Sequence, residues 1–256
     1  MNRIPRFLGT VLLLAGWGIA WPADAQTACH DDPRRAAEQR ALDEAQIAEL
    51  LRVRPALAPP ARLQTLLDQL VAVSPGLRER PPVKLLVLDD RELNAFAADH
   101  GVVILTRALL DPRHGLGEDE LAAVLAHELA HVEVRDALAE ACDMQLRVGD
   151  ASTGIAQVRA RLATIRPDSS VAHDAHELLH AQELLADARG IALLRLAGRD
   201  PQAMARVLVK LHAPTLAGAV LLSAPTHPAL NERLNRAREQ ANGLPQGPDA
   251  PVRPRP

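Results

Sequence analysis

Apolar residues recur at helical spacing over most of the chain. Proline-containing or glycine-containing breaks interrupt this spacing, notably at residues 55–60 and 198–201. Three acidic residues open the segment that begins at Gly117, where they favour the positive end of a helix dipole. The predicted helices cover residues 33–54, 61–73, 117–146, 173–197, 201–212 and 229–240.

A shorter region has the character of β-strands. Residues 83–88 form an aliphatic run between prolines and two aspartates, and residues 94–97 and 102–106 follow, joined by a turn at 99–101. The polar stretch 149–172, with Gly, Ser and Pro, predicts a loop or a loose helical excursion. The pattern therefore predicts an α+β fold that is mainly α-helical, with a small sheet just ahead of the third helix.

The two ends of the chain depart from this pattern. Residues 1–25 contain two arginines, an apolar run from Phe7 to Trp21 and a small-residue cleavage site, which together predict a secretory signal peptide. An uncleaved membrane anchor is the alternative. Five prolines in the last twelve residues predict a disordered tail over residues 241–256. Residues 26–240 are left as the folded domain.

Composition narrows the class of protein. The 256 residues are 48% hydrophobic and 24% charged, with a formal net charge of −3, which is typical of a soluble globular domain. The chain has no basic excess and only two Phe, two Trp and no Tyr, so little is available to bind phosphates or stack on bases. A nucleic-acid partner is not expected.

Two cysteines, Cys29 and Cys142, follow the predicted signal peptide. A lone pair of cysteines in an exported protein favours a disulfide. Lipid attachment at Cys29 is the alternative, but residues 26–28 lack the aliphatic residue expected three positions before a lipidated cysteine. The disulfide is the favoured prediction.

The motif HExxH occurs twice, at residues 127–131 and 176–180. Histidines at i and i+4 lie on one face of a helix and can hold one zinc ion, while the intervening Glu acts as a general base. The first copy lies in an apolar helical segment, and the predicted strands just before it offer an edge to which an extended peptide can add. We therefore expect His127 and His131 to be zinc ligands and Glu128 to be the base.

A catalytic zinc site needs a third protein ligand. The second copy has no metzincin pattern, because Glu183 stands where Gly is needed and Ala186 where His is needed. Its helix instead offers Glu183 as the third ligand, with Asp187 one turn further to accept a hydrogen bond from a ligating histidine. His176 and His180 are expected on a partly exposed helix face, with a weaker second metal site or a proton-linked modulator as alternatives.

These motifs, in their order, resemble zinc metallopeptidase family forty-eight, the group of the CAAX prenyl proteases and the HtpX heat-shock protease. The resemblance spans about residues 83–238. Its segments are Asn94 to Ala97 with Gly101 to Leu105, Glu118 to His131, Glu183 to Asp187, and His227-Pro228 with Arg233.

The resemblance implies a zincin-like architecture with a small sheet beside the active-site helix and one Zn²⁺ per chain. His227 would face the metal, either as a displaceable fourth ligand or as a donor that steadies the oxyanion, and Arg233 would order that end of the cleft. The implied metal ligands are His127, His131 and Glu183, and the implied catalytic group is Glu128, His227, Asp187 and Arg233.

The resemblance also implies a function, an exported zinc endopeptidase that acts on misfolded or envelope polypeptides in the periplasm. Peripheral association with the membrane or with envelope assembly machinery is a further expectation, and lipid anchoring through Cys29 is the alternative localisation. A proteolytically silent, zinc-containing chaperone or scaffold is the competing function. Glu128 argues against it, because a structural zinc site needs no base.

Overall fold

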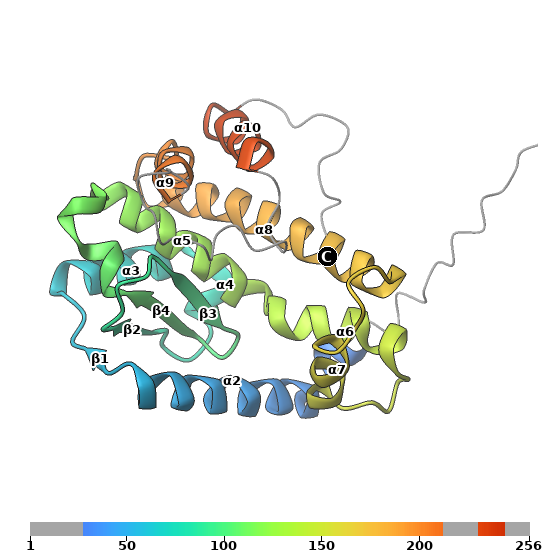
Figure 1. Cartoon of the computed structure of the whole chain (residues 1–256). Helices are drawn as coiled ribbons and strands as arrows, with labels where there is room; N and C mark the ends of the chain where they lie inside the picture. Colours follow the sequence, from blue (N-terminus) through green and yellow to red (C-terminus); the bar gives the residue numbers. More distant parts are fainter. Residues whose placement is uncertain (1–27, 212–229, 244–256) are drawn as a thin grey trace, which may run out of the picture.

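The structure is a computed structural model that describes residues 28–211 and 230–243. Helices enclose a small sheet on several sides (Figure 1). The predicted signal peptide, the loop that carries His227 and most of the proline-rich tail lie outside the described residues. The prediction of a mainly helical α+β fold is confirmed.

The four strands are β1 (Ala56–Leu57), β2 (Lys84–Leu88), β3 (Ala95–Ala98) and β4 (Val102–Thr106), in the spatial order β1-β2-β4-β3. β2 and β4 are parallel, whereas β3 and β4 form an antiparallel hairpin whose turn ends at Gly101, with φ of 91°. The three predicted strands are confirmed. β1 was missed, because two residues in a proline-rich break carry no strand pattern.

The described helices match the predicted ones with three differences. The helix predicted over 117–146 is two helices, and a short helix over residues 75–78 was not predicted. The stretch 149–172, predicted as a loop or a loose helical excursion, contains one short helix and the start of the longest one. No helix in the described parts of the chain is long and apolar enough to cross a bilayer. The helices are α2 (Pro33–Val53), α3 (Ala61–Val73), α4 (Pro75–Arg78), α5 (Glu118–Val134), α6 (Asp136–Val148), α7 (Ile155–Leu162), α8 (Ser170–Leu196), α9 (Ala203–Leu211) and α10 (Leu230–Ala241), with 3₁₀ turns η1 (Arg107–Leu110) and η2 (Pro112–His114).

The break between α5 and α6 falls at Arg135, which adopts a left-handed conformation with φ of 55°. The turn between β3 and β4 fixes this junction, because the Asp99 carboxylate accepts hydrogen bonds from the backbone N–H groups of Ala137 (3.3 Å) and Leu138 (2.8 Å). Asp99 thus caps the exposed N–H groups at the start of α6. The chain turns directly after the HExxH segment as a result.

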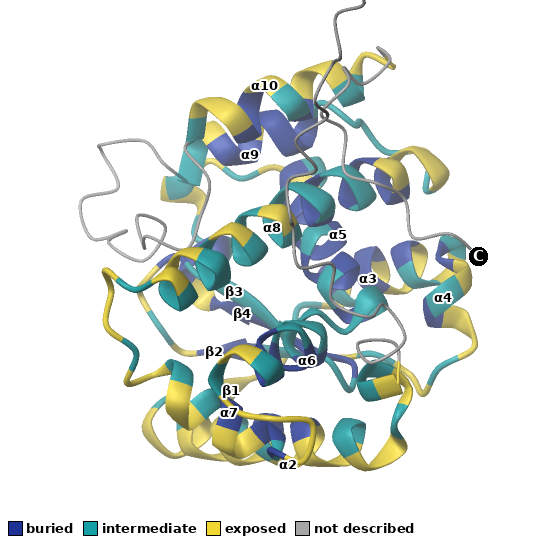
Figure 2. Cartoon of the chain, turned by 90° about the vertical axis from the view of Figure 1, so that its right-hand side faces the viewer, coloured by how far each residue is buried: buried dark blue, intermediate teal, exposed yellow. Residues whose placement is uncertain are grey.

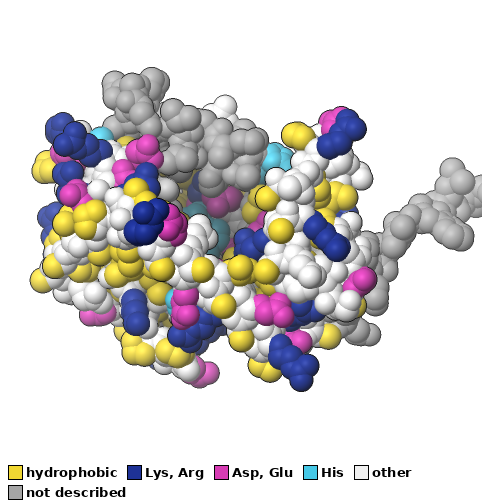
Figure 3. Space-filling model, turned by 60° about the horizontal axis from the view of Figure 1, so that its bottom comes forward, with side chains coloured by type: hydrophobic (Ala, Val, Ile, Leu, Met, Phe, Trp, Pro, Cys, Tyr) yellow, Lys and Arg dark blue, Asp and Glu magenta, His cyan; other side chains and the backbone are white. Residues whose placement is uncertain are grey.

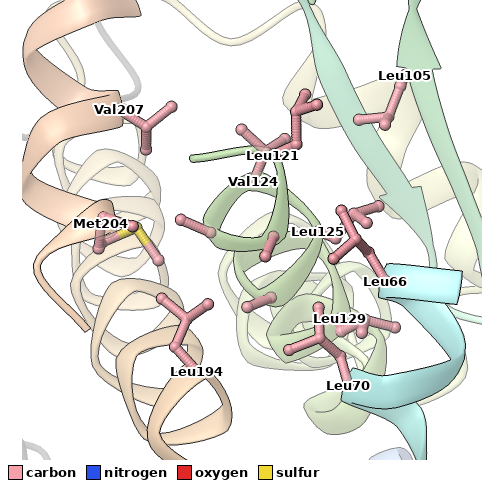
Figure 4. Close-up of a cluster of buried hydrophobic side chains, with 14 of the residues drawn as sticks. Leu66, Leu70, Leu105, Leu121, Val124, Leu125, Leu129, Leu194, Met204 and Val207 are labelled. Atoms are coloured by element: carbon pink, nitrogen blue, oxygen red, sulfur yellow. The ribbon is translucent and has the colours of Figure 1, made fainter. Parts of the chain in front are cut away.

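Helix α5 lies at the centre of the fold and is buried over most of its length (Figure 2). In Figure 4, leucines of α3 and β4 pack on one side of α5, and side chains of α8 and α9 pack on the other. Burial on all sides holds the helix rigidly. The residues drawn around it include Leu66, Leu70 and Leu105 on the first side and Leu194, Met204 and Val207 on the second.

A glycine brings α8 close to α5. A Cβ atom at Gly190 would lie 2.7 Å from Met204 Cε and 3.2 Å from the backbone N of His127, distances that real Cβ contacts rarely show. The absence of a side chain therefore lets the two helices approach at the first histidine of the motif. Glu183 and Asp187 precede Gly190 on the same helix and are carried toward α5 with it.

Cys29 and Cys142 form a disulfide, with a Cα–Cα distance of 5.7 Å. The bond fastens the segment before α2 to α6. The predicted pairing is confirmed, and because its sulfur is in a disulfide, Cys29 offers no thiol for a lipid.

Candidate active site

The first HExxH copy and helix α8 bring three candidate ligands together. The Nε2 atoms of His127 and His131 are 3.1 Å apart. Glu183 Oε2 lies 3.7 Å from His127 Nε2, and Glu183 Oε1 lies 3.6 Å from His131 Nε2. The three side chains therefore converge on one point, as predicted from the sequence, and their ligand atoms all lie within 4.8 Å of one another.

The outer nitrogen of each histidine meets a carboxylate. His127 Nδ1 is 3.0 Å from Asp187, and His131 Nδ1 is 2.6 Å from Asp136. Because an ionised carboxylate only accepts hydrogen bonds, each Nδ1 carries a proton, and the Nε2 of a neutral ring presents a lone pair. The two Nε2 atoms face each other and Glu183, an arrangement that suits a metal ion or, in its absence, a proton shared between the rings.

The charge of the site agrees with that fit. Burial alone would lower the pKa of His131, but the hydrogen bond to Asp136 and the nearby charges of Glu128 and Glu183 outweigh it and raise this pKa to about 9. Without a metal, the site therefore attracts a proton to the place that a cation would occupy. Two imidazoles and a carboxylate are a donor set that suits zinc.

Arg233 of α10 holds the acidic side of the site. Its guanidinium donates to both oxygens of Asp187, each at 2.8 Å, and lies 2.9 Å from Glu183. Burial alone would raise the pKa of Asp187, but hydrogen bonds and charge from Arg233, with a smaller contribution from His127, outweigh it and leave the pKa lowered. Asp187 is therefore ionised and can accept a hydrogen bond from His127 Nδ1.

Glu128 lies beside the ligands but outside their group. Its side chain is buried and lines the same cavity as His127 and His131. Burial raises its pKa, and the two histidines offset this effect only in part. A carboxylate with a raised pKa is a stronger base than an ordinary one, which suits it to accept a proton from water.

The ligands open into a cavity of about 450 Å³. Strand β3, at the edge of the sheet, forms one wall with residues 94–97. The space-filling view shows a hollow with acidic and histidine side chains at its bottom (Figure 3). Apolar side chains from η1, α5 and α9 form another wall: Leu109, Val124, Met204, Val207 and Leu208.

The second HExxH copy does not take part in this group. The His176 and His180 rings lie 3.9 Å apart on α8, but neither lines the cavity or belongs to the three converging ligands. Its glutamate, Glu177, is 71% exposed and lies 3.6 Å from His173. The expected partly exposed histidine face is what the structure has, while a role in proton binding or weaker metal binding stays a prediction.

Sequence reasoning missed Asp136. In a continuous helix a residue five positions beyond His131 would point about 140° away from it. The turn at Arg135 brings Asp136 back to His131 instead. No glycine or proline marks that turn, so the sequence carried no signal for it. His227 lies outside the described residues, so its place stays a prediction.

Comparison with known proteins finds a matching peptidase family. The profile of Peptidase family M48 matches residues 58–241. The Beta-barrel assembly-enhancing protease of Yersinia pestis is 34% identical over 204 residues, covering 73% of this chain and 40% of that protein. The Protease HtpX homolog of Desulfatibacillum aliphaticivorans is 31% identical over 229 residues, covering 68% of this chain and 69% of that protein.

The same assembly-enhancing protease from Escherichia coli K12 is 33% identical over 180 residues, covering 64% of this chain and 36% of that protein. The chain thus spans less than half the length of the two beta-barrel assembly-enhancing proteases. Among solved structures, Ste24p of S. mikatae aligns with a TM-score of 0.47 and 15% identity over 79% of this chain and 55% of its own. Because the family profile covers most of the sequence, the chain belongs to peptidase family M48.

Proposed function

We propose that this protein is a zinc-dependent endopeptidase. The observation that carries the proposal is the convergence of two histidine Nε2 lone pairs and the Glu183 carboxylate beside a buried Glu128, in a cavity open to an edge strand. Membership of a peptidase family supports the same reaction. His127, His131 and Glu183 are the proposed ligands of one zinc ion.

Each side chain has a role in peptide hydrolysis. A zinc ion held by the three ligands supplies Lewis-acid activation of a water molecule and of the scissile carbonyl. Glu128 accepts the proton of the attacking water and delivers it to the leaving amine. Asp187 and Asp136 hold the two imidazoles in the binding tautomer, and Arg233 fixes Asp187 and Glu183.

The cavity wall favours a polypeptide substrate. Among the described residues β3 pairs with β4 alone, so its other edge can accept an extended peptide as an additional strand across the ligands. The relatives named beta-barrel assembly-enhancing proteases suggest misfolded or envelope proteins as substrates and envelope assembly machinery as a peripheral partner. The disulfide and the predicted signal peptide favour the periplasm as the compartment.

Replacing Glu128 by Gln tests the proposal. We expect Glu128→Gln to keep about one zinc per chain but to hydrolyse a fluorescently labelled unfolded protein at least about a hundredfold more slowly, because it lacks a base. Glu118→Gln, an exposed change at the start of the same helix, is the matched control and should keep full activity. Equal activity of wild type and Glu128→Gln removes the mechanism. A wild type that binds zinc yet cleaves nothing supports the chaperone or scaffold.

His227 is proposed as a displaceable fourth ligand that covers the open zinc position until a substrate enters. Imidazole is neutral over most of the physiological pH range and can offer a lone pair. His227→Ala is then expected to cleave unfolded protein faster and less selectively. If His227 instead donates to the oxyanion, the same variant loses about a hundredfold in rate, and the ligand role is excluded.

A further inference from the structure

A second cavity, of about 350 Å³, lies beside the junction between α5 and α6. The first half of α2, the residues after α4, the turn between β3 and β4 and the junction itself form its walls. Asp99 is the one residue that its lining shares with that of the active-site cavity. The second cavity is therefore a separate space, and the reaction proposed above makes no use of it.

Three arginines line this cavity, and Arg40 is paired with Glu44. The other two have weak counter-charge, since Arg135 Nη2 lies 3.7 Å from the exposed Asp31 and Arg80 relies on backbone carbonyls. Arg80 donates to the carbonyl oxygens of Val132 and Glu133 at 2.8 and 2.9 Å, and among the described residues it forms no ion pair. Burial lowers its pKa, and the positive charge of Arg135 lowers it further. The Nε of Arg135 is buried without a hydrogen-bond partner among the described residues. Two neighbouring guanidinium groups whose charge is only partly balanced attract an anion.

The carboxylates nearest to the cavity are already engaged. Asp99 accepts the two N–H groups that cap α6. Asp43 is buried, accepts a hydrogen bond of 2.6 Å from Gln39 and faces His100 at 3.5 Å. Neither group can also neutralise the two arginines. Glu133, whose charge also acts on Arg80, is bonded to Ser74 and Arg189, and Asp31 is exposed. An anion in the cavity would therefore add counter-charge that these carboxylates supply only in part.

The rest of the lining is mainly apolar. Aliphatic side chains line the cavity from α2, from the segment around α4 and from the α5–α6 junction, so an inorganic anion would leave most of it unfilled. The shape and chemistry fit a ligand with an anionic end and a short aliphatic body. The apolar lining residues are Ala36, Ala37, Leu77, Pro81, Val83, Val132 and Leu138.

We propose that this cavity binds a carboxylate with a short aliphatic body, its head group between Arg80 and Arg135. Planar guanidinium groups bind carboxylates through paired hydrogen bonds. A free carboxylic acid and the last residue of a polypeptide share this chemistry. Either one places the same group in the same cavity.

The site lies on the residues that set the active-site geometry. Arg80 binds the last carbonyls of α5, Arg135 is the turn itself, and Asp136 follows it and holds His131 Nδ1. A carboxylate that ties Arg80 to Arg135 therefore stabilises the turn that presents Asp136. We expect occupancy to raise zinc affinity, and zinc to raise carboxylate affinity by the same factor. This coupling rests on the proposed zinc site, whereas carboxylate binding does not.

Calorimetric titration of the full chain with hexanoate and with N-acetyl-leucine tests the binding site. Hexanol and N-acetyl-leucinamide are the matched neutral probes, and each acid should bind at least about tenfold more tightly than its neutral counterpart. Binding of both acids identifies free carboxylates as sufficient, while binding of N-acetyl-leucine alone identifies a polypeptide end. Equal affinity for acid and neutral probe overturns the proposal.

Two variants localise the binding. Arg135→Asn removes the guanidinium, and Asn tolerates the left-handed conformation. Ala37→Leu fills the cavity and keeps both arginines, whereas Ala45→Leu, on an exposed part of α2, is its control. We expect at least tenfold weaker acid binding in the first two variants and no change in the third. Wild-type binding by Ala37→Leu overturns the proposal even if Arg135→Asn fails to fold. Because these titrations need no hydrolysis, an inactive zinc site does not affect them.

Discussion

The two HExxH segments share a five-residue pattern but occupy different surroundings. Residues 127–131 lie in α5, with helices and the sheet packed around them, whereas residues 176–180 lie in the first half of α8, where Glu177 is largely exposed. In the first segment each outer histidine nitrogen meets a carboxylate, and Glu183 completes the group. In the second, the described residues hold no third ligand. The carboxylate partners, and not the motif itself, distinguish the proposed metal site from the second copy.

The same comparison explains why the second segment lies where it does. Helix α8 contributes Glu183 and Asp187 one and two turns after His180, and Gly190 lets this helix approach α5. The part of α8 that matters for the site is thus the acidic stretch. Its HELLH pattern is a neighbour of the site in sequence, without a part in the ligand group.

The largest expected effect comes from removing the cation that holds the acidic side of the first site. Arg233→Met takes the guanidinium away from the buried Asp187 and the part-buried Glu183, which costs about 3–5 kcal/mol in the free energy of unfolding. Urea denaturation measures this loss. Arg236→Met, on the same helix with an exposed partner at Glu232, should change it by less than about 0.5 kcal/mol. Equal losses in the two variants would mean that the ion pairs of Arg233 stabilise the fold no more than the exposed pair of Arg236 does.

A smaller effect is expected where one histidine loses its orienting carboxylate. Asp136→Asn keeps the side-chain shape but weakens the hold on His131 Nδ1, so zinc affinity should fall by about 10–100-fold while the fold stays intact. Competition with a chelator measures the affinity. Asp143→Asn, further along α6 and outside the active-site cavity, is the control. An unchanged affinity in Asp136→Asn would show that the first segment binds metal without this partner.

The sequence predicted the candidate ligands better than their supports. Helical spacing groups His127 with His131 and Glu183 with Asp187, and the need for a third ligand led us to pair the two helices, which the structure brings together. Asp136 depends on a turn at a residue that has neither the glycine nor the proline that marks such turns. Asp99, which fixes that turn, comes from a hairpin 36 positions earlier. Contacts of this kind depend on tertiary packing and leave no local pattern.

The same limit applies to the fold. Three of the four described strands and most described helices were predicted, because their apolar spacing or their breakers are local. The position of α7 was not predicted within its polar segment, although Ile155 and Val158 are fully buried on one face of it. Apolar spacing predicted α2, but its most deeply buried residues are Gln39 and Asp43, which that pattern does not identify.

The most direct test of the account compares the zinc content of two double variants. His127→Ala/His131→Ala removes the first pair of histidines, and His176→Ala/His180→Ala removes the second from an otherwise identical chain. Elemental analysis after gel filtration gives zinc per chain. We predict about one zinc in the wild type and in the second variant, and none in the first. Loss of zinc from the second variant with retention in the first would contradict the assignment of the site to α5.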